Sequence, residues 1–447
     1  MDKNVLIFGF GVTGKSALKA LSKLNYNIYV YDKNENYEDD LNIDFKIFKN
    51  KDELDKIDFI IKSPGINPAN EILEEARNKG IKIISDIEFA YEITKCKNIV
   101  AITGTNGKTT TTTLVSEILK KVNTTYCVGN IGKGILDIAL EAKEDDYIVI
   151  EASSFQLADT INFRPLVSAI TNVTSDHLDW HGSVSNYRNA KFNIFRNQKD
   201  NDVTILNYND ENLRNLKFSE ERKVLYFATE DISKLGAYLK DSKIYFRDFK
   251  GNDTYIMDRS EIRIPGMHNV ENILTAVSIA MSLNISADII KDAVSNFLGV
   301  ENRIEFVREI KKVKYYNDSK GTNPDSTIMA IKAMDDNLIL IAGGYDKKAD
   351  FGAMLNIGKD KIKHLILLGE TAPQLEREAK PMGYDIYIVK DLNRAVELAH
   401  KLAEENDTIL LSPACASWDM YPSYEIRGEH FRNLVNELGE YDGFKKN

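Results

Sequence analysis

A glycine-rich segment, Gly104-Thr105-Asn106-Gly107-Lys108-Thr109-Thr110, has the residue types and spacing that point most directly to chemistry. It follows an apolar run over 98–103 and precedes an apolar helical pattern, so a strand would lead into the turn and a helix out of it. In that setting glycine N–H groups approach phosphate oxygens, the Lys108 ammonium meets the terminal phosphates and the Thr109 hydroxyl binds Mg²⁺. We expect a nucleotide site here, although Ile102 stands where the strict pattern has glycine.

Two later apolar runs end in residues suited to a metal site. The run over 147–151 ends in Glu151, and the run over 167–171 leads into a polar loop that contains Asp176 and His177. The carboxyl ends of parallel strands meet at one edge of a sheet, which is where a Mg²⁺ ligand or a water-orienting group belongs. We interpret Glu151 as a candidate metal contact and His177 or Asp176 as a second one, with a solvated glutamate and a structural histidine as the alternatives.

A second glycine pattern, Gly9-x-Gly11-x-x-Gly14, follows the apolar run over 5–8, and Asp32 ends the next apolar run. Such glycines let the backbone approach a diphosphate at the N-terminus of a helix, and an acidic residue at this distance binds a ribose hydroxyl in dinucleotide sites. Taken alone the pattern indicates NAD, but the same physics serves other nucleotide diphosphates.

The elements that must position these residues alternate along three stretches of the chain, which predicts an α/β protein. Strands are expected near residues 5–8, 28–31, 59–61, 81–84, 98–103, 147–151, 167–171, 203–207, 337–342, 364–368, 385–389 and 408–411. Alternating residues between about 223 and 265 indicate antiparallel hairpins inserted in the second stretch. A polar junction and a hinge-like segment place domain boundaries so that the chain divides into 1–94, 95–299 and 300–447.

Composition excludes several classes of protein. The 447 residues are 43% hydrophobic with a net charge of -10, which is typical of a folded protein without a positive field for nucleic acid or anionic membranes. Three scattered cysteines, Cys96, Cys127 and Cys415, argue against a disulfide framework. No secretory signal pattern and no membrane-spanning apolar run is visible, so we expect a cytoplasmic protein.

Several motifs together resemble the Mur ligase family, the ATP-dependent amino-acid ligases of peptidoglycan synthesis. They are the glycine-rich segment and residues 151–157, 171–177, 187–191, 266–272, 317–323 and 411–417, so the resemblance covers nearly the whole chain. Residues 9–14, 63–66, 343–351 and 417–419 are most similar to the branch that adds D-glutamate.

This resemblance implies a Rossmann-like nucleotide-sugar domain, a central P-loop ATPase domain and a mobile, Rossmann-like C-terminal domain. ATP would phosphorylate the carboxylate of UDP-N-acetylmuramoyl-L-alanine, and the amine of D-glutamate would attack the acyl phosphate. The central chemistry would fall to Lys108, Glu151, His177 and Lys191, with two Mg²⁺ ions held by Thr109, Glu151, His177 and Lys191. Lys191 matches the family position that carries a carbamate, which would replace a repelling cation by oxygen ligands.

The remaining contacts implied by the resemblance fall into three groups. ATP would also meet Asn269, Asn272, Arg303, Asp318 and Lys320. The nucleotide sugar would meet Gly11, Val12, Thr13, Gly14, Asp32, Lys33, Gly65 and Asn130. D-glutamate would meet Thr322, Lys347, Ser417, Trp418 and Tyr424. Two positions depart from the family pattern, since Asn302 stands where His is usual and Tyr424 where Phe is often found.

Other functions stay open at this point. A folylpolyglutamate synthase-like ligase would share the later motifs but lacks a comparable N-terminal domain, and the Asp-Asn-Pro-Arg motif of the diaminopimelate- or lysine-adding ligases does not occur. A nucleotide-binding protein without turnover and an NAD oxidoreductase are the alternatives from other classes. We expect a monomer with small-molecule substrates and neither nucleic-acid nor membrane partners.

Overall fold

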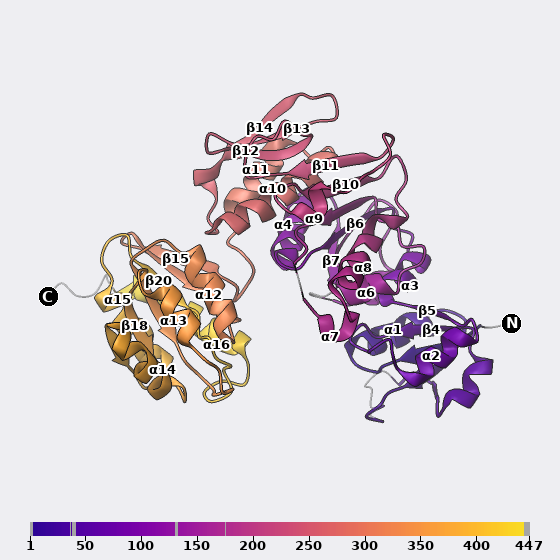
Figure 1. The fold of residues 1–447 in the computed structure, drawn as a ribbon, viewed down its shortest axis with the longest axis horizontal. Helices are drawn as coiled ribbons and strands as arrows, with labels where there is room; N and C mark the ends of the chain where they lie inside the picture. The colour runs from indigo at the N-terminus through magenta and orange to yellow at the C-terminus, as the bar shows by residue number, and fades with distance from the viewer. Residues whose placement is uncertain (1–2, 36, 38–41, 130–132, 175, 442–447) are drawn as a thin grey trace. The chain divides into compact units, whose positions relative to one another are not determined.

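The computed structural model describes residues 3–35, 37, 42–129, 133–174 and 176–441 (Figure 1). Contacts between Cα atoms divide the chain into two compact units, one of residues 1–259 with 270–294 and one of residues 260–269 with 295–447. Among the described residues, four sheets carry the strands, which confirms the expected α/β class. No helix in the described part of the chain has the length and apolar character needed to cross a bilayer.

The N-terminal sheet is parallel and has the order β3-β2-β1-β4-β5. Its strands are β1 (Lys3–Phe8), β2 (Tyr26–Tyr31), β3 (Lys46–Ile47), β4 (Phe59–Lys62) and β5 (Lys82–Ile84). Its helices are α1 (Val12–Ser22), η1 (Lys51–Lys56), α2 (Glu71–Asn78) and α3 (Asp86–Ile93). Residues 5–8 of β1 are buried without alternation, because helices cover both faces of a parallel sheet.

The central sheet belongs to the same compact unit and is also parallel, with the order β11-β10-β9-β6-β8-β7. Its strands are β6 (Asn98–Thr103), β7 (Thr125–Gly129), β8 (Tyr147–Glu151), β9 (Val167–Ile170), β10 (Val203–Asn207) and β11 (Lys223–Phe227). Its helices are α4 (Lys108–Lys120), α5 (Ile135–Ile138), α6 (Ser154–Ala158), α7 (Leu178–His181), α8 (Val184–Arg196) and α9 (Glu211–Arg214).

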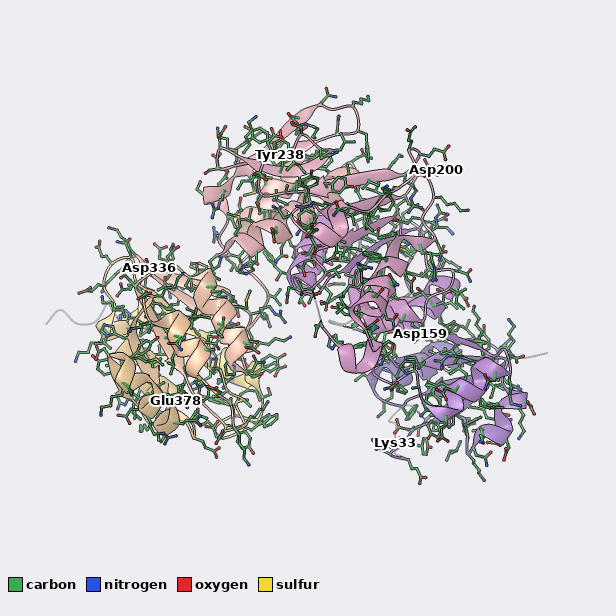
Figure 2. All side chains as sticks on the ribbon, in the orientation of Figure 1. Lys33, Asp159, Asp200, Tyr238, Asp336 and Glu378 are labelled. Atoms are coloured by element: carbon green, nitrogen blue, oxygen red, sulfur yellow. The ribbon has the colours of Figure 1, made fainter. Side chains whose placement is uncertain are left out.

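The inserted sheet is antiparallel, as expected, but it begins later than the sequence pattern indicated. It comprises β12 (Gly236–Lys240), β13 (Lys243–Arg247) and β14 (Asp253–Asp258), and Tyr238 in Figure 2 marks it. The expectation that hairpins begin near residue 223 is wrong, because β11 pairs in parallel with β10 and buries Leu225 and Phe227. The short η2 (Arg259–Glu261) and the helices α10 (Met267–Ser282) and α11 (Ala287–Asn296) follow.

The C-terminal sheet is mixed, with the order β15-β16-β20-β17-β18-β19. Its strands are β15 (Glu305–Ile310), β16 (Val313–Asn317), β17 (Leu338–Ala342), β18 (Ile362–Leu367), β19 (Ile386–Ile388) and β20 (Thr408–Leu411). Its helices are α12 (Pro324–Ala333), α13 (Gly352–Gly358), α14 (Ala372–Ala379), η3 (Lys380–Met382), α15 (Leu392–Leu402) and α16 (Tyr424–Tyr441). Only the β15–β16 pair is antiparallel among the described strands of this sheet, so the Rossmann-like expectation holds for the rest.

Candidate active site

The glycine-rich loop joins β6 to α4 with two glycines that no other residue could replace without displacement. Gly104 has φ +154° and Gly107 has φ +80°, both in the region that favours glycine. A Cβ at Gly104 would overlap the Thr171 hydroxyl, and a Cβ at Gly107 would overlap the Asn272 amide oxygen. The segment therefore has the strand–loop–helix setting of a P-loop. The free N–H groups in the first turn of α4 are available to bind an anion.

The loop after β9 fixes the shape of the P-loop through hydrogen bonds that the sequence did not reveal. The Thr171 hydroxyl donates to the carbonyl of Asn106 at 2.6 Å, and the Asn106 N–H donates to Oδ1 of Asn172 at 2.8 Å. The Thr105 N–H donates to the carbonyl of Asn172 at 2.9 Å. Lys108 Nζ donates to the carbonyls of Gly104 and Thr105, both at 2.9 Å, which places the ammonium against the loop that it serves.

Glu151 lies at the end of β8 and His177 lies in the loop that follows β9, and these two strands flank the P-loop strand β6. Glu151 ends β8, pairs with Ile102 of β6 and is buried. His177, after β9, has φ +49° and an exposed side chain whose ring lies 4.8 Å from that of Phe155. Among the described residues, no group of three or more His, Cys, Asp or Glu side chains could hold a metal by itself. A Mg²⁺ ion here would need the hydroxyl of Thr109 and phosphate oxygens as further ligands.

Lys191 of α8 reaches the back of the P-loop. Its Nζ donates to the carbonyl of Gly104 at 2.7 Å and lies 4.5 Å from the ring centre of Tyr187, whose hydroxyl lies 3.1 Å from that of Thr105. Burial, with the nearby Lys108 charge, lowers the pKa of Lys191 to about 7. A substantial fraction of this amine is therefore neutral near pH 7, and only the neutral amine is a nucleophile.

The asparagines of α10 lie in different surroundings. The Asn272 amide oxygen meets the P-loop at Gly107 and lies 3.4 Å from the Thr111 hydroxyl, so this side chain lies beside the P-loop and the first turns of α4. Asn269 Nδ2 donates to the carbonyl of Pro265 at 2.7 Å, within the second unit. Both side chains are buried.

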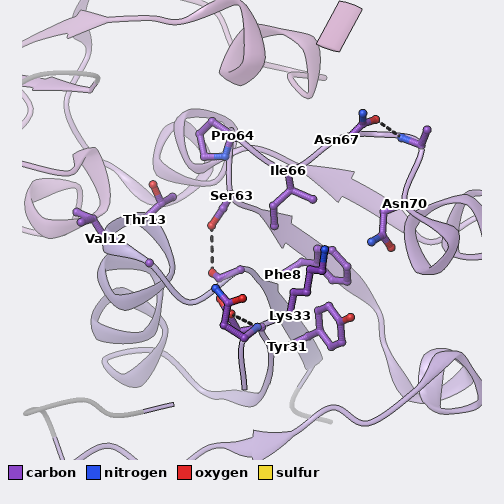
Figure 3. Close-up of a pocket in the computed structure, with 16 residues that line it drawn as sticks. Phe8, Val12, Thr13, Tyr31, Lys33, Ser63, Pro64, Ile66, Asn67 and Asn70 are labelled. Carbon is purple, nitrogen blue, oxygen red and sulfur yellow. Dashed lines mark hydrogen bonds between the residues drawn. The ribbon is translucent and has the colours of Figure 1, made fainter. Parts of the chain in front are cut away.

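The N-terminal sheet carries a cavity of about 720 Å³ at the carboxyl ends of β1, β2 and β4 (Figure 3). Six of the residues expected to meet the nucleotide sugar line it, namely Gly11, Val12, Thr13, Asp32, Lys33 and Gly65. The cavity also takes in Phe8 and Tyr31, whose rings stack at 4.7 Å, and the loop over 63–70. Because α1 begins at Val12, its N-terminal N–H groups favour a diphosphate at this wall.

Two other residues expected to contact the nucleotide sugar, Gly14 and Asn130, are not among the described residues that line the cavity. Gly14 packs against the strand turn, since a Cβ there would overlap the carbonyl oxygen of Gly9. Asn130 lies outside the described residues. The carboxylate of Asp32 accepts hydrogen bonds from the N–H groups of Phe10 at 2.7 Å and Asn34 at 2.9 Å, so it shapes the cavity wall.

In the second unit, predicted residues gather at the carboxyl ends of β16, β20 and β17. Asp318, which follows β16, accepts a hydrogen bond from the Ser412 hydroxyl at 2.7 Å, and burial raises its pKa to about 7. Lys320 Nζ lies 5.6 Å from the ring centre of Tyr424. Arg303 is exposed, one residue beyond the departure at position 302.

Asn302 has a structural role. It is buried at φ +61°, a conformation that Asn tolerates better than most residues. Its Oδ1 accepts a hydrogen bond from Asn317 at 2.9 Å, its carbonyl accepts from the Lys320 N–H at 2.9 Å, and a Cβ at Gly428 would overlap it. The residue thereby fixes the loop that carries Asp318 and Lys320.

The residues expected at the acceptor amino acid lie on two loops that are tied together. The N–H of Tyr345 donates to the carbonyl of Ala416 at 2.9 Å, which joins the loop after β17 to the loop after β20. Lys347 Nζ consequently lies 4.5 Å from the ring centre of the exposed Trp418. Thr322 is half-buried and Ser417 is buried, next to Trp418 in the chain. Ammonium and hydroxyl groups of this kind suit a carboxylate ligand.

Three models of protein-family domains match consecutive parts of the chain. Residues 3–85 match the model described as Mur ligase MurD-like, N-terminal domain, residues 102–280 match Mur ligase middle domain, and residues 302–415 match Mur ligase, glutamate ligase domain. The chain is 45% identical over 449 residues to a UDP-N-acetylmuramoylalanine--D-glutamate ligase of Thermoanaerobacter sp. (strain X514), covering 98% of each. It belongs to the Mur ligase family.

Other relatives agree with this assignment. A UDP-N-acetylmuramoylalanine--D-glutamate ligase of Clostridioides difficile (strain 630) is 42% identical to this chain. The alignment covers 98% of this chain and 99% of that relative. A solved structure of a MurF ligase from Thermotoga maritima in complex with ADP covers 98% of this chain and 96% of its own, with TM-score 0.55 and 17% identity. At that identity the likeness shows the fold alone.

One further residue of this Mur ligase was missed by the sequence reasoning. Arg427 of α16 is buried, and its Nε donates to the Ser319 hydroxyl at 2.9 Å. Its Nη2 donates to the carbonyls of Ser319 at 2.8 Å and Cys415 at 3.2 Å, and burial lowers its pKa to about 10. Arg427 thus holds the loop after β16 against the loop after β20. No local motif signals this role, because the partners lie far apart in the chain.

Proposed function

We propose that this Mur ligase adds D-glutamate to UDP-N-acetylmuramoyl-L-alanine at the expense of ATP. The observation that carries the proposal is identity of 42 to 45% over 98% of the chain to relatives named for that reaction. The sites support it, because one compact unit holds both a cavity suited to a nucleotide diphosphate and a P-loop. The other unit offers ammonium and hydroxyl groups for an amino acid with two carboxylates.

The P-loop side of the reaction transfers a phosphoryl group. The γ-phosphoryl group passes to a carboxylate oxygen of the nucleotide sugar and ADP leaves, which makes the acyl carbon a better electrophile. Lys108 and the N–H groups at the start of α4 offset the negative charge that otherwise keeps a carboxylate away from ATP. Asn272, beside Gly107, borders this site.

The acceptor side forms the amide. The neutral amine nitrogen of D-glutamate attacks the acyl carbon to form a tetrahedral adduct. The adduct gives its amine proton to water or to the departing phosphate, and inorganic phosphate leaves with the electron pair of the broken C–O bond. Lys347, Thr322 and Ser417 would hold the two glutamate carboxylates, while Trp418 and Tyr424 would border them. Asp318, Lys320 and Arg303 would serve ATP from the same unit.

Mg²⁺ fits the donor set at the P-loop. Thr109 and the buried Glu151 supply the oxygen ligands that Mg²⁺ prefers, and His177 completes the proposed set. Bound Mg²⁺ would neutralise phosphate charge. A protonated Lys191 would repel the ion, whereas a carbamate on Lys191 would supply oxygens, and a pKa of about 7 favours the neutral amine that carbamate formation needs.

The organisation of the chain is part of the same proposal. We place the nucleotide-sugar domain in residues 1–94, the ATPase domain in 95–299 and the third domain in 300–447, since each range holds its own parallel or mixed sheet. We also propose a cytoplasmic monomer without nucleic-acid or membrane partners. The acidic net charge and the unpaired cysteines support that view.

The test is phosphate release from ATP and Mg²⁺ with UDP-N-acetylmuramoyl-L-alanine present. D-glutamate, L-glutamate and no amino acid are compared in parallel. Release that requires both the nucleotide sugar and D-glutamate supports the proposal. Release with a folate and L-glutamate in place of these substrates would assign the chain to another glutamate ligase, and no release with any acceptor would leave a binding protein.

A further inference from the structure

A buried lysine joins the N-terminal cavity to the central domain, and the function proposed above makes no use of it. Lys62 ends β4, and its side chain is fully buried. Its Nζ lies 3.0 Å from Oδ2 of Asp159, labelled in Figure 2, and donates to the carbonyl of Ile66 at 3.1 Å. A buried ammonium group that has no access to water is stable only with such partners, so Asp159 and the Ile66 carbonyl fix the position of the Lys62 side chain.

Trp180 of α7 binds the same carbonyl from the other domain of the unit. Its Nε1 donates to the carbonyl of Ile66 at 3.2 Å, and the Lys62 ammonium lies 5.2 Å from its ring centre. One peptide oxygen therefore accepts hydrogen bonds from two sides, and the lysine also makes a cation–π contact. We call Lys62, Trp180 and the Ile66 carbonyl the Ile66 clamp.

The Ile66 clamp holds a wall of the nucleotide-sugar cavity. Ile66 lines the cavity, and a Cβ at Gly9 would overlap both its Cδ1 and Ser63 (Figure 3). The Ser63 hydroxyl donates to the carbonyl of Gly9 at 3.0 Å. Any shift of the clamp would move the loop over 63–66 and the glycine turn where a diphosphate would bind.

The other end of the Ile66 clamp meets the metal side of the site. The Phe155 ring lies 4.9 Å from that of Trp180 and 4.8 Å from that of His177. The backbone N–H of Trp180 donates to the backbone carbonyl of His177 at 3.2 Å, within the turn that carries both residues. A continuous set of packed and hydrogen-bonded groups thus runs from the cavity wall to the proposed Mg²⁺ contact.

We propose that Lys62 and Trp180 are positioning residues that align the nucleotide sugar, through the Ile66 carbonyl, with the His177 loop of the ATP site. The proposal rests on the proposed function for the identity of the ligands. Because the clamp fixes the cavity wall, loss of a clamp hydrogen bond weakens nucleotide-sugar binding and misplaces its carboxylate, while ATP binding to the P-loop is unchanged.

The first test is steady-state kinetics of Trp180→Phe, which removes the N–H donor and retains a ring. A hydrogen bond worth about 0.5–1.5 kcal/mol corresponds to a rise of about twofold to tenfold in the KM for the nucleotide sugar. The KM for ATP should stay within about twofold of wild type. Lys62→Met should raise the nucleotide-sugar KM further, because the Ile66 carbonyl and Asp159 both lose their buried cationic partner.

The matched control is Lys79→Met. Lys79 forms a 2.7 Å ion pair with Asp55 in the same N-terminal domain but away from the cavity-lining residues, so its loss should leave all constants unchanged. Equal rises in both KM values, or a wild-type nucleotide-sugar KM for Trp180→Phe, would overturn the proposal. If Lys62→Met does not fold, Trp180→Phe alone decides the question.

A second readout does not depend on turnover. The chain has two tryptophans, so Trp418→Phe leaves Trp180 as the single emitter. Titration of that variant with UDP should shift the Trp180 emission, and Lys62→Met in the same background should reduce the shift. Absence of a shift at concentrations where UDP binding is measured calorimetrically would contradict the clamp. Failure of wild-type enzyme to use D-glutamate, with the UDP shift intact, would count against the proposed acceptor only.

Discussion

Replacement of Arg427 by Met is expected to loosen both loops of the C-terminal site at once. The guanidinium makes hydrogen bonds to Ser319 Oγ, Ser319 O and Cys415 O. At about 1.5–3 kcal/mol for each charge-assisted bond, their loss amounts to about 6 kcal/mol. Burial opposes the charged form and lowers the pKa of Arg427 to about 10, so the cost of burying the charge offsets part of this loss. The net destabilisation is therefore smaller than this sum, and we expect about 3 kcal/mol.

Calorimetry and kinetics measure the effect of Arg427→Met separately. A loss of about 3 kcal/mol should lower the Tm of the C-terminal unit by about 6–12 °C. The KM values for ATP and for D-glutamate should both rise, since Ser319 lies between Asp318 and Lys320 while Cys415 precedes Ser417. Arg427→Lys should recover only part of the loss, because an ammonium lacks the planar fork. An Arg427→Met protein with unchanged Tm and unchanged KM values would refute this reasoning.

Three further outcomes are expected. Gly107→Ala should raise the KM for ATP about tenfold or more, because its Cβ would overlap Asn272. The control is Gly251→Ala, which has a similar φ but open space around its Cβ. This control should lose only about 1 kcal/mol of stability to left-handed strain and should leave the KM for ATP unchanged. Since the pKa of Lys191 lies near 7, its neutral fraction rises from about a tenth at pH 6 to about nine tenths at pH 8. Activation by bicarbonate and carbamate trapped for mass spectrometry should increase over that window and be absent in Lys191→Met; a response confined to pH above 9 would contradict the pKa. Lys347→Ala should raise the KM for D-glutamate about tenfold to a hundredfold without a matching change for ATP, and Lys348→Ala serves as the control.

Periodicity predicted most strands because parallel strands buried on both faces are continuous apolar runs. β6 and β17 are such runs. β7 was missed because Thr125–Gly129 is short and mixed in composition, and β15 was missed because Glu305–Ile310 carries three charged residues on an edge. β11 was misassigned because an edge strand alternates in the same way as an antiparallel hairpin.

The P-loop could be recognised because its chemistry is local, with Lys108 three to four residues from the carbonyls that it meets. The groups that shape the site from a distance could not be read in this way. Thr171 binds the P-loop across 65 positions, and Arg427 binds Ser319 across 108. No periodicity or spacing rule connects such pairs, since only the folded sheet brings them together.

The position of β20 has a consequence for how the chain is made. β20 lies between β16 and β17, so Lys314 and Leu338 both pair with Thr408, which leaves the ribosome long after them. The middle of this sheet therefore cannot form during synthesis until residues 408–411 have emerged, and long-range parallel pairing of this kind is slow. Nascent chains that end before β20 would expose the apolar edges of β16 and β17, which makes premature termination in this region a source of aggregation rather than of a shortened, partly active enzyme.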